Sequence, residues 1–73
     1  RVKTKGVFMK LKRYYIDASM LSLEDRVKAI EFIENASWTC KLIRVGCYVC
    51  FWEEDVNPAQ YPALAKCVVK EIP

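Results

Sequence analysis

Four cysteines carry the most varied chemistry in this sequence, because a thiol can bind a metal, exchange with a disulfide or fill a core. They are Cys40, Cys47, Cys50 and Cys67. Cys47 and Cys50 form a Cys-x-x-Cys pair inside a strand-like run, where residues three apart point to opposite faces and cannot grip one ion. A redox pair of this spacing needs its first thiol at the beginning of a helix. We expect reduced cysteines without a metal, with a four-cysteine zinc site as the alternative.

Carboxylates are the other residues with catalytic potential. Asp17 follows the first expected strand, and the acidic run at residues 53–55 follows a later one. The chain has no histidine to act as a general base, and it has no phosphate-binding loop or nucleophile elbow. A lone aspartate after a strand is typically a turn residue. We therefore expect a protein that is not an enzyme and uses no cofactor.

Size and composition favour one small domain, residues 1–73, in which a native start at Met9 would make residues 1–8 a cloning remnant. A chain of 73 residues buries only about 60% of its unfolded surface. Apolar residues nevertheless make up 53%, enough to leave some for a partner. The net charge of +3 permits a polyanion. No apolar run reaches about 18 residues and no signal-peptide pattern is present, so we expect a cytoplasmic protein without a membrane partner.

The first half of the chain predicts a strand and then a helix. Side chains alternate along residues 7–14, and one face of that strand carries Phe8, Lys10, Lys12 and Tyr14. Ser22 caps the helix that follows, with Asp25 at the third position of the cap. The expected core stripe is Leu23, Val27, Ile30 and Ile33. A broader apolar arc, made by Ala29, Phe32 and Ala36, covers either a loop or a partner.

The second half predicts a hairpin, a short helix and a last strand. A two-residue loop at Val45 and Gly46 joins strands on either side. The outward face then carries Thr39, Lys41, Ile43, Tyr48, Cys50 and Trp52, and the core face carries Trp38, Cys40, Leu42, Val49 and Phe51. Cys40 and Cys47 share that core face but lie about 13 Å apart, too far for a disulfide. Asn57 and Pro58 begin a second helix, and residues 66–72 form either a strand or a C-terminal helix.

The expected order is β-α-β-β-α-β, an α+β fold of the ferredoxin-like kind. It has a four-stranded antiparallel sheet with two helices on one face. The alternative is βαββα with a C-terminal helix. In the first layout the other face of the sheet is open, and rings and cations interleave at its centre. The candidate binding residues for a nucleic acid or another partner are Lys10, Lys12, Tyr14, Lys41, Arg44, Tyr48 and Trp52.

The run RVGCYVCF, residues 44–51, resembles the third-strand signature of the RNA recognition motif family. It matches at Arg44, Tyr48, Val49 and Phe51, and departs at Val45, Gly46 and Cys47. The first-strand signature of that family looks like VFMKLK, with Phe8 at the stacking position. The resemblance implies that aromatic side chains on the two central strands stack on bases.

We therefore expect a small non-enzymatic binding protein that holds single-stranded nucleic acid on an exposed aromatic and basic sheet face. The alternative is a protein-binding adaptor, or an inhibitor of the compact type that phages encode. It would act through the same sheet face or through the broad apolar helix face. A homodimer through the open face is a further possibility. The salt dependence of binding distinguishes a nucleic-acid partner from a protein partner, because phosphate binding weakens steeply as the salt concentration rises.

Overall fold

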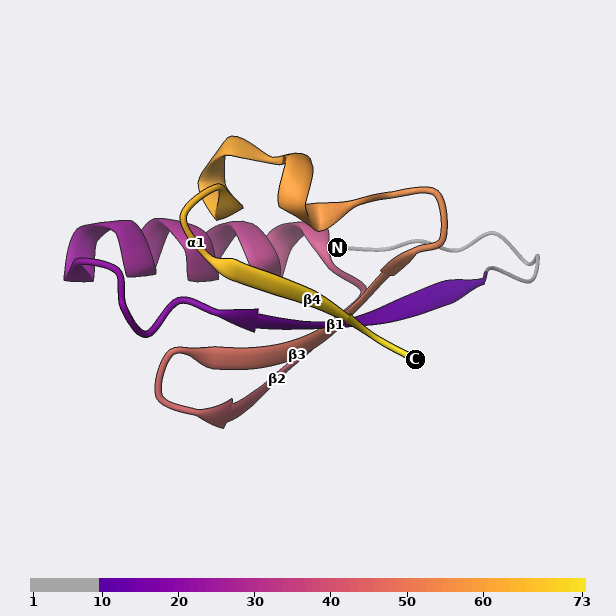
Figure 1. Cartoon of the computed structure of the whole chain (residues 1–73), viewed down its shortest axis with the longest axis horizontal. Coiled ribbons are helices and arrows are strands. Elements are labelled where there is room, and N and C mark those ends of the chain that lie inside the picture. Colours follow the sequence, from indigo (N-terminus) through magenta and orange to yellow (C-terminus); the bar gives the residue numbers. More distant parts are fainter. Residues whose placement is uncertain (1–9) are drawn as a thin grey trace.

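The computed structural model describes residues 10–73, which form a four-stranded antiparallel sheet with one α-helix across one face (Figure 1). The elements are β1 (Leu11–Asp17), α1 (Leu23–Ala36), β2 (Thr39–Arg44), β3 (Cys47–Glu53) and β4 (Val68–Ile72). The strand order is β2-β3-β1-β4, so β1 and β3 are central. Within these residues no helix has the length and apolar content needed to cross a membrane.

The predicted two-helix ferredoxin-like layout is wrong, because no second α-helix lies between β3 and β4. The chain there makes only two 3₁₀ turns, η1 (Pro58–Gln60) and η2 (Pro62–Leu64). Asn57 does cap the first turn, its side-chain oxygen accepting from the Ala59 N–H at 3.0 Å. Tyr61 precedes a proline and is extended, with φ −84° and ψ 136°, as steric contact with a proline ring favours. Pro62 therefore stops the helix after one turn. The alternative with a C-terminal helix is also wrong, because residues 68–72 are β4.

Helix α1 begins where the sequence predicts, but only part of the predicted stripe is buried. The Ser22 hydroxyl oxygen accepts a hydrogen bond from the Asp25 N–H at 3.2 Å, which confirms the cap. Ala29 and Ile33 are the fully buried residues of the helix, so the prediction is confirmed for Ile33. Leu23 and Val27, expected in the core, are 72% and 45% exposed. The other helix residues that pack on the core belong to the broader arc, and they are Ala29, Phe32 and Ala36.

The hairpin has its predicted two-residue loop, but β2 and β3 pair one residue out of the predicted register. Arg44 pairs with Cys47 across the loop, and an irregularity then lies between Leu42 and Arg44. The extra residue brings Leu42 opposite Tyr48 and Cys40 opposite Cys50. A one-residue slip moves a strand's side chains to the other face. The predicted assignment of Tyr48, Cys50 and Trp52 to the outward face is also wrong, because all three are buried on the helix side.

The core is centred on Trp52, whose side chain is 2% exposed. Its ring stacks on Phe32 of α1 and on Tyr61 between the two 3₁₀ turns, with centroids 6.2 Å apart in each case. Phe32 and Tyr61 contact each other at 4.9 Å. The indole N–H of Trp52 points at the Cys50 sulfur, 3.0 Å away. One side chain thus joins the sheet, the helix and the loop before β4.

Replacing Trp52 with alanine is expected to lower the free energy of unfolding by about 3–5 kcal/mol. Such a loss removes most of the stability of a small domain. Urea unfolding followed by far-ultraviolet circular dichroism measures it. Val45→Ala is the control, because Val45 is 76% exposed and its truncation should cost less than about 0.5 kcal/mol. Equal costs for the two variants would contradict the central role of the indole.

Gly46 is the one described residue whose backbone demands glycine. Its φ is +80°, and a Cβ built there would lie 2.7 Å from the Ser19 Cα. Its carbonyl accepts from the Ala18 N–H at 2.7 Å, which ties the hairpin to the end of β1. Gly46→Ala is therefore expected to cost more than about 1 kcal/mol of unfolding free energy, whereas Val45→Ala next to it should not. Equal urea midpoints for these neighbours would contradict a close approach of the two loops.

Candidate binding face on the open side of the sheet

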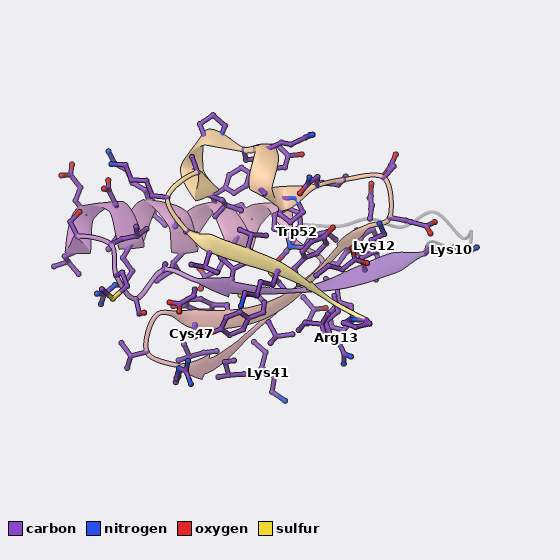
Figure 2. The ribbon with its side chains drawn as sticks, viewed as in Figure 1. Lys10, Lys12, Arg13, Lys41, Cys47 and Trp52 are labelled. Atoms are coloured by element: carbon purple, nitrogen blue, oxygen red, sulfur yellow. The ribbon has the colours of Figure 1, made fainter. Side chains whose placement is uncertain are left out.

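The sheet face turned away from α1, which we call the open face, is defined by the strand register. On β1 it carries Arg13, Tyr15 and Asp17, because Tyr14 and Ile16 point into the core. Directly opposed residues of antiparallel strands share a face. Phe51 and Ile72 lie opposite Arg13, and Val49 and Lys70 lie opposite Tyr15. Lys41 lies opposite Val49. Figure 2 shows Arg13 and Lys41 on this side and Trp52 between the sheet and the helix.

Cations come to the open face from three of the strands. They are Arg13 on β1, Lys41 and Arg44 on β2, and Lys70 on β4, and all four are exposed. The carboxylates on the same face, Asp17 and Glu53, lie at opposite ends of the β1–β3 pair. Both accept hydrogen bonds, Asp17 from Ser19 and Glu53 from the Trp38 indole at 3.2 Å. The middle of the face is therefore positive.

Two half-buried rings lie among these cations, Tyr15 on β1 and Phe51 on β3. The Tyr15 hydroxyl accepts from the Arg44 guanidinium at 3.2 Å and contacts the Cys47 sulfur at 3.4 Å. The bond to Cys47 raises the pKa of the Tyr15 phenol. The ring is therefore held neutral and fixed in place, with a cation at its edge.

The structure places only part of the predicted binding set on the open face. Lys41 and Arg44 lie there. Tyr14, Tyr48 and Trp52 are 7%, 9% and 2% exposed on the opposite side, so their predicted outward placement is wrong. The cause is the alternation of β1 and β3, which runs one residue out of phase with the prediction.

The other two predicted lysines, Lys10 and Lys12, do not lie among the cations of the open face. Lys12 shares the side of Tyr14, with its ammonium 4.0 Å from the Glu71 carboxylate, and Lys10 precedes β1. The predicted stacking residue Phe8 lies outside the described residues. The resemblance to the RNA recognition motif put Tyr48 among residues that stack on bases, and here Tyr48 is under the helix. Arg13, Tyr15 and Phe51 were missed. The alternation of β1 and β3 contains these residues, but it had to be assigned with the opposite face outward.

The cysteines divide between the two faces of the sheet. Cys40 and Cys50 lie opposite each other on the core side. Cys47 belongs to the open side, where it lies beneath Tyr15 and is 1% exposed. A single zinc ion therefore cannot be bound by these three thiols together. Across residues 10–73 there is no group of three or more cysteines, histidines and carboxylates placed to hold a metal.

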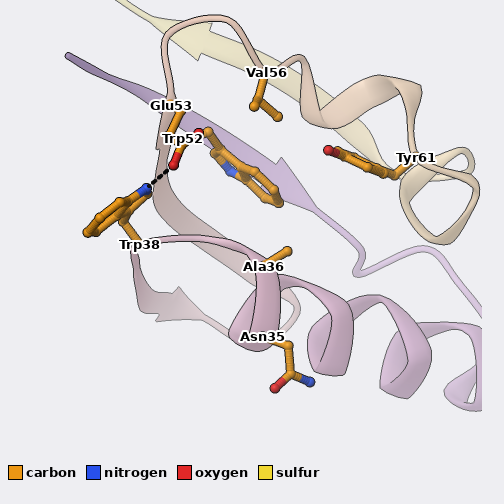
Figure 3. Close-up of a pocket in the computed structure, with 7 residues that line it drawn as sticks. All are labelled: Asn35, Ala36, Trp38, Trp52, Glu53, Val56 and Tyr61. Atoms are coloured by element: carbon orange, nitrogen blue, oxygen red, sulfur yellow. Dashed lines mark hydrogen bonds between the residues drawn. The ribbon is translucent and has the colours of Figure 1, made fainter. Parts of the chain in front are cut away.

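A cleft of about 290 Å³ lies where α1 ends and β3 leaves the sheet (Figure 3). Its walls are Asn35, Ala36, Trp38, Trp52, Glu53, Val56 and Tyr61. The Trp38 indole closes one side by donating to the Glu53 carboxylate. The cleft is at the small end of the range for ligand sites, about 300–1,000 Å³. Because two of its walls, Trp52 and Tyr61, belong to the core stack, it is the rim of the core, and we assign it no ligand.

Asp17 links the open face to acid stability. The Ser19 hydroxyl and the Ser19 N–H donate to its carboxylate at 2.6 and 2.8 Å, and these bonds lower the pKa of Asp17. A depressed folded-state pKa stabilises the fold above the unfolded value of about 3.9, and the contribution disappears as the pH falls through the folded value. The Ser19→Ala variant is therefore expected to have a lower free energy of unfolding than the unmodified protein at neutral pH. On acidification below about pH 4, its free energy of unfolding should fall by less than that of the unmodified protein.

Urea midpoints measured between neutral pH and about pH 2 test this. The matched control is Asp55→Asn, which removes an exposed carboxylate from the turn after β3 and leaves the Asp17–Ser19 pair intact. A Ser19→Ala variant as acid-sensitive as the unmodified protein would show that these hydrogen bonds are unimportant.

Comparisons with known proteins add no family to this description. No protein-family model, curated protein or solved structure matches the chain. What the protein does must therefore be argued from the open face and the exposed apolar residues alone.

Proposed function

We propose that this protein binds single-stranded nucleic acid on the open face, without catalysing a reaction. The observation that carries the proposal is the set of four exposed cations, Arg13, Lys41, Arg44 and Lys70, around the half-buried rings of Tyr15 and Phe51. Lysine and arginine neutralise phosphates, and aromatic faces stack on unpaired bases. Both kinds of group are needed for an unpaired strand, and here they share one surface. The expected partner is RNA or DNA in the cytoplasm.

The register supports side-by-side stacking of two bases. Tyr15 lies opposite Val49, and Phe51 is two residues farther along the same strand. The two rings are therefore diagonal neighbours on adjacent strands, about 7–8 Å apart. Lys41 lies on one flank, opposite Val49, and Lys70 lies on the other, opposite Tyr15. A strand crossing the sheet over these rings would meet a cation on each side.

A second candidate is protein binding, which a different surface favours. Met20, Leu23 and Val45 are 91%, 72% and 76% exposed. They belong to the loop before α1, the first turn of α1 and the β2–β3 loop. The hydrogen bond from the Ala18 N–H to the Gly46 carbonyl joins the two loops. Exposed apolar residues gathered at one end of a small protein are typical of a protein-binding site. An adaptor or an inhibitor would use this end rather than the basic face.

Paired lysine substitutions test the nucleic-acid proposal. Labelled single-stranded RNA and DNA are titrated at several salt concentrations, with anisotropy as the measurement. Lys41→Ala with Lys70→Ala removes two phosphate partners, so the slope of log affinity against log salt should fall by about 1.4. Phe51→Leu keeps an apolar side chain but removes the ring, and it should weaken binding by about 1–3 kcal/mol.

The matched control removes the same charge from the other side of the molecule. Lys28 pairs with Glu24 at 3.6 Å and Lys66 pairs with Asp25 at 3.3 Å, both on the helix side. Lys28→Ala with Lys66→Ala should leave the slope unchanged. Equal slopes for the two double variants would mean that only net charge matters. No binding at low salt by a folded protein would reject the proposal and leave the exposed apolar end as the functional surface.

A further inference from the structure

We propose that Cys40 and Cys50 are a modification site, a pair of thiols that closes to a cross-strand disulfide when a small-molecule disulfide oxidant is present. The two residues are Cα partners on β2 and β3 and lie on the same, helix-covered side of the sheet. This inference is independent of nucleic-acid binding. It rests on the register and on the surroundings of the two sulfur atoms.

Backbone hydrogen bonds show which kind of pair the two cysteines form. The Gly46 carbonyl accepts from the Ala18 N–H at 2.7 Å, and the Glu54 N–H donates to the Lys10 carbonyl at 3.0 Å. These bonds lie just beyond the two ends of the β1–β3 pairing. Backbone N–H and C=O groups point to alternate sides along a strand, so residues separated by an even number point the same way. Cys50 is four residues from both Gly46 and Glu54, and it therefore directs its N–H and C=O toward β1.

Cys40 and Cys50 are therefore a non-hydrogen-bonded pair between β2 and β3. In such a pair the Cα atoms lie about 4.5 Å apart and the side chains are close. Disulfides span Cα separations of about 4.4–6.8 Å. The bond can thus form without moving either strand by more than a small adjustment.

The two thiols differ in access, which sets the order of reaction. Cys50 is completely buried, with the Trp52 indole N–H 3.0 Å from its sulfur. Cys40 is half-buried on the edge strand, near Glu34 of α1. Burial raises the pKa of both thiols, that of Cys50 to about 11. Cys40 is therefore the thiol that an oxidant reaches first, and the exchange is faster in mild alkali, where more thiolate is present.

The remaining cysteines have no such partner. Cys47 lies on the opposite face of the sheet, beneath Tyr15. Cys67 follows η2, and its N–H donates to the Leu64 carbonyl at 3.1 Å. Neither is a Cα partner of another cysteine in the pairings of the four described strands. Oxidation should therefore join one specific pair.

The reaction balances as two exchanges with oxidised glutathione. The Cys40 thiolate attacks one sulfur of the oxidant, forms a mixed disulfide and releases one glutathione thiolate. The Cys50 thiolate then attacks the Cys40 sulfur and releases the second. Two protein thiols are oxidised, the glutathione disulfide is reduced to two thiols, and the two protons pass to solvent or to the departing thiolates. The product fastens the edge strand that carries Lys41 and Arg44 to the centre of the sheet.

The experiment treats the folded chain with oxidised glutathione at about pH 8.5, blocks the remaining thiols with an alkylating reagent and maps the peptides by mass spectrometry. The expected result is an internal Cys40–Cys50 disulfide with Cys47 and Cys67 alkylated. Oxidation should also raise the Tm by at least about 5 °C and change the tryptophan fluorescence, because Trp52 contacts the Cys50 sulfur. A reductant should reverse both changes.

Cys40→Ser should abolish the disulfide, the increase in Tm and the change in fluorescence. It replaces a half-buried residue, so the fold should tolerate it. Cys67→Ser is the matched control and should keep them. A lasting mixed disulfide at Cys40 without closure, a disulfide between any other pair, or closure only in urea would each overturn the proposal.

Discussion

The packing of Trp52 between Phe32 and Tyr61 decides how the rest of the molecule is arranged. The indole is the largest side chain buried on the sheet, and it contacts the helix and the loop before β4. Once it points toward α1, residues two apart on β3 must do the same, which buries Cys50 and Tyr48. The pairing of β1 with β3 then sends Tyr14 inward and Tyr15 outward. The composition of the open face is a consequence of this one burial.

Local signals in the sequence predict the ends of the elements well. A serine with an aspartate three residues later marks the start of α1, and Val45 with Gly46 marks the hairpin loop. Asn57 followed by proline marks a cap. Each of these depends on the backbone of a few neighbouring residues. The second proline, Pro62, carried the information that the cap would lead to a single turn.

The phase of the strands could not be predicted from such signals. On β3, valine and phenylalanine alternate with tyrosine, cysteine and tryptophan, so both sets are apolar enough to be buried. On β1, two adjacent tyrosines make either phase plausible. The choice depends on Phe32 and Tyr61, which are distant in sequence from both strands. Of the candidate site, Lys41 was identified because the predicted alternation of β2 already turned it outward. Arg44 reaches the same face only because of the irregularity between Leu42 and Arg44.

The irregularity in the β2–β3 hairpin has a separate consequence, because it brings two thiols together. With an unbroken hairpin, Lys41 would lie opposite Cys50. The irregularity between Leu42 and Arg44 puts Cys40 there instead. A bulge next to a tight loop is thus enough to turn separate cysteines into a pair, while Cys47 remains across the sheet. The spacing of the cysteines along the chain does not predict the Cys40–Cys50 pair, because the pairing depends on the number of residues in the bulge.

Charge is distributed in a way that the net value of +3 understates. Helix α1 carries four carboxylates, Glu24, Asp25, Glu31 and Glu34, and two cations. The middle of the open face carries cations. The molecule is 22 Å across even along its shortest axis, whereas the Debye length at physiological salt is about 8 Å. A polyanion placed at the open face would therefore be screened from the carboxylates of the far side and would respond to the nearby cations. Under the proposed function, this asymmetry would orient an approaching phosphate chain toward the rings of Tyr15 and Phe51, which the net charge by itself would not do.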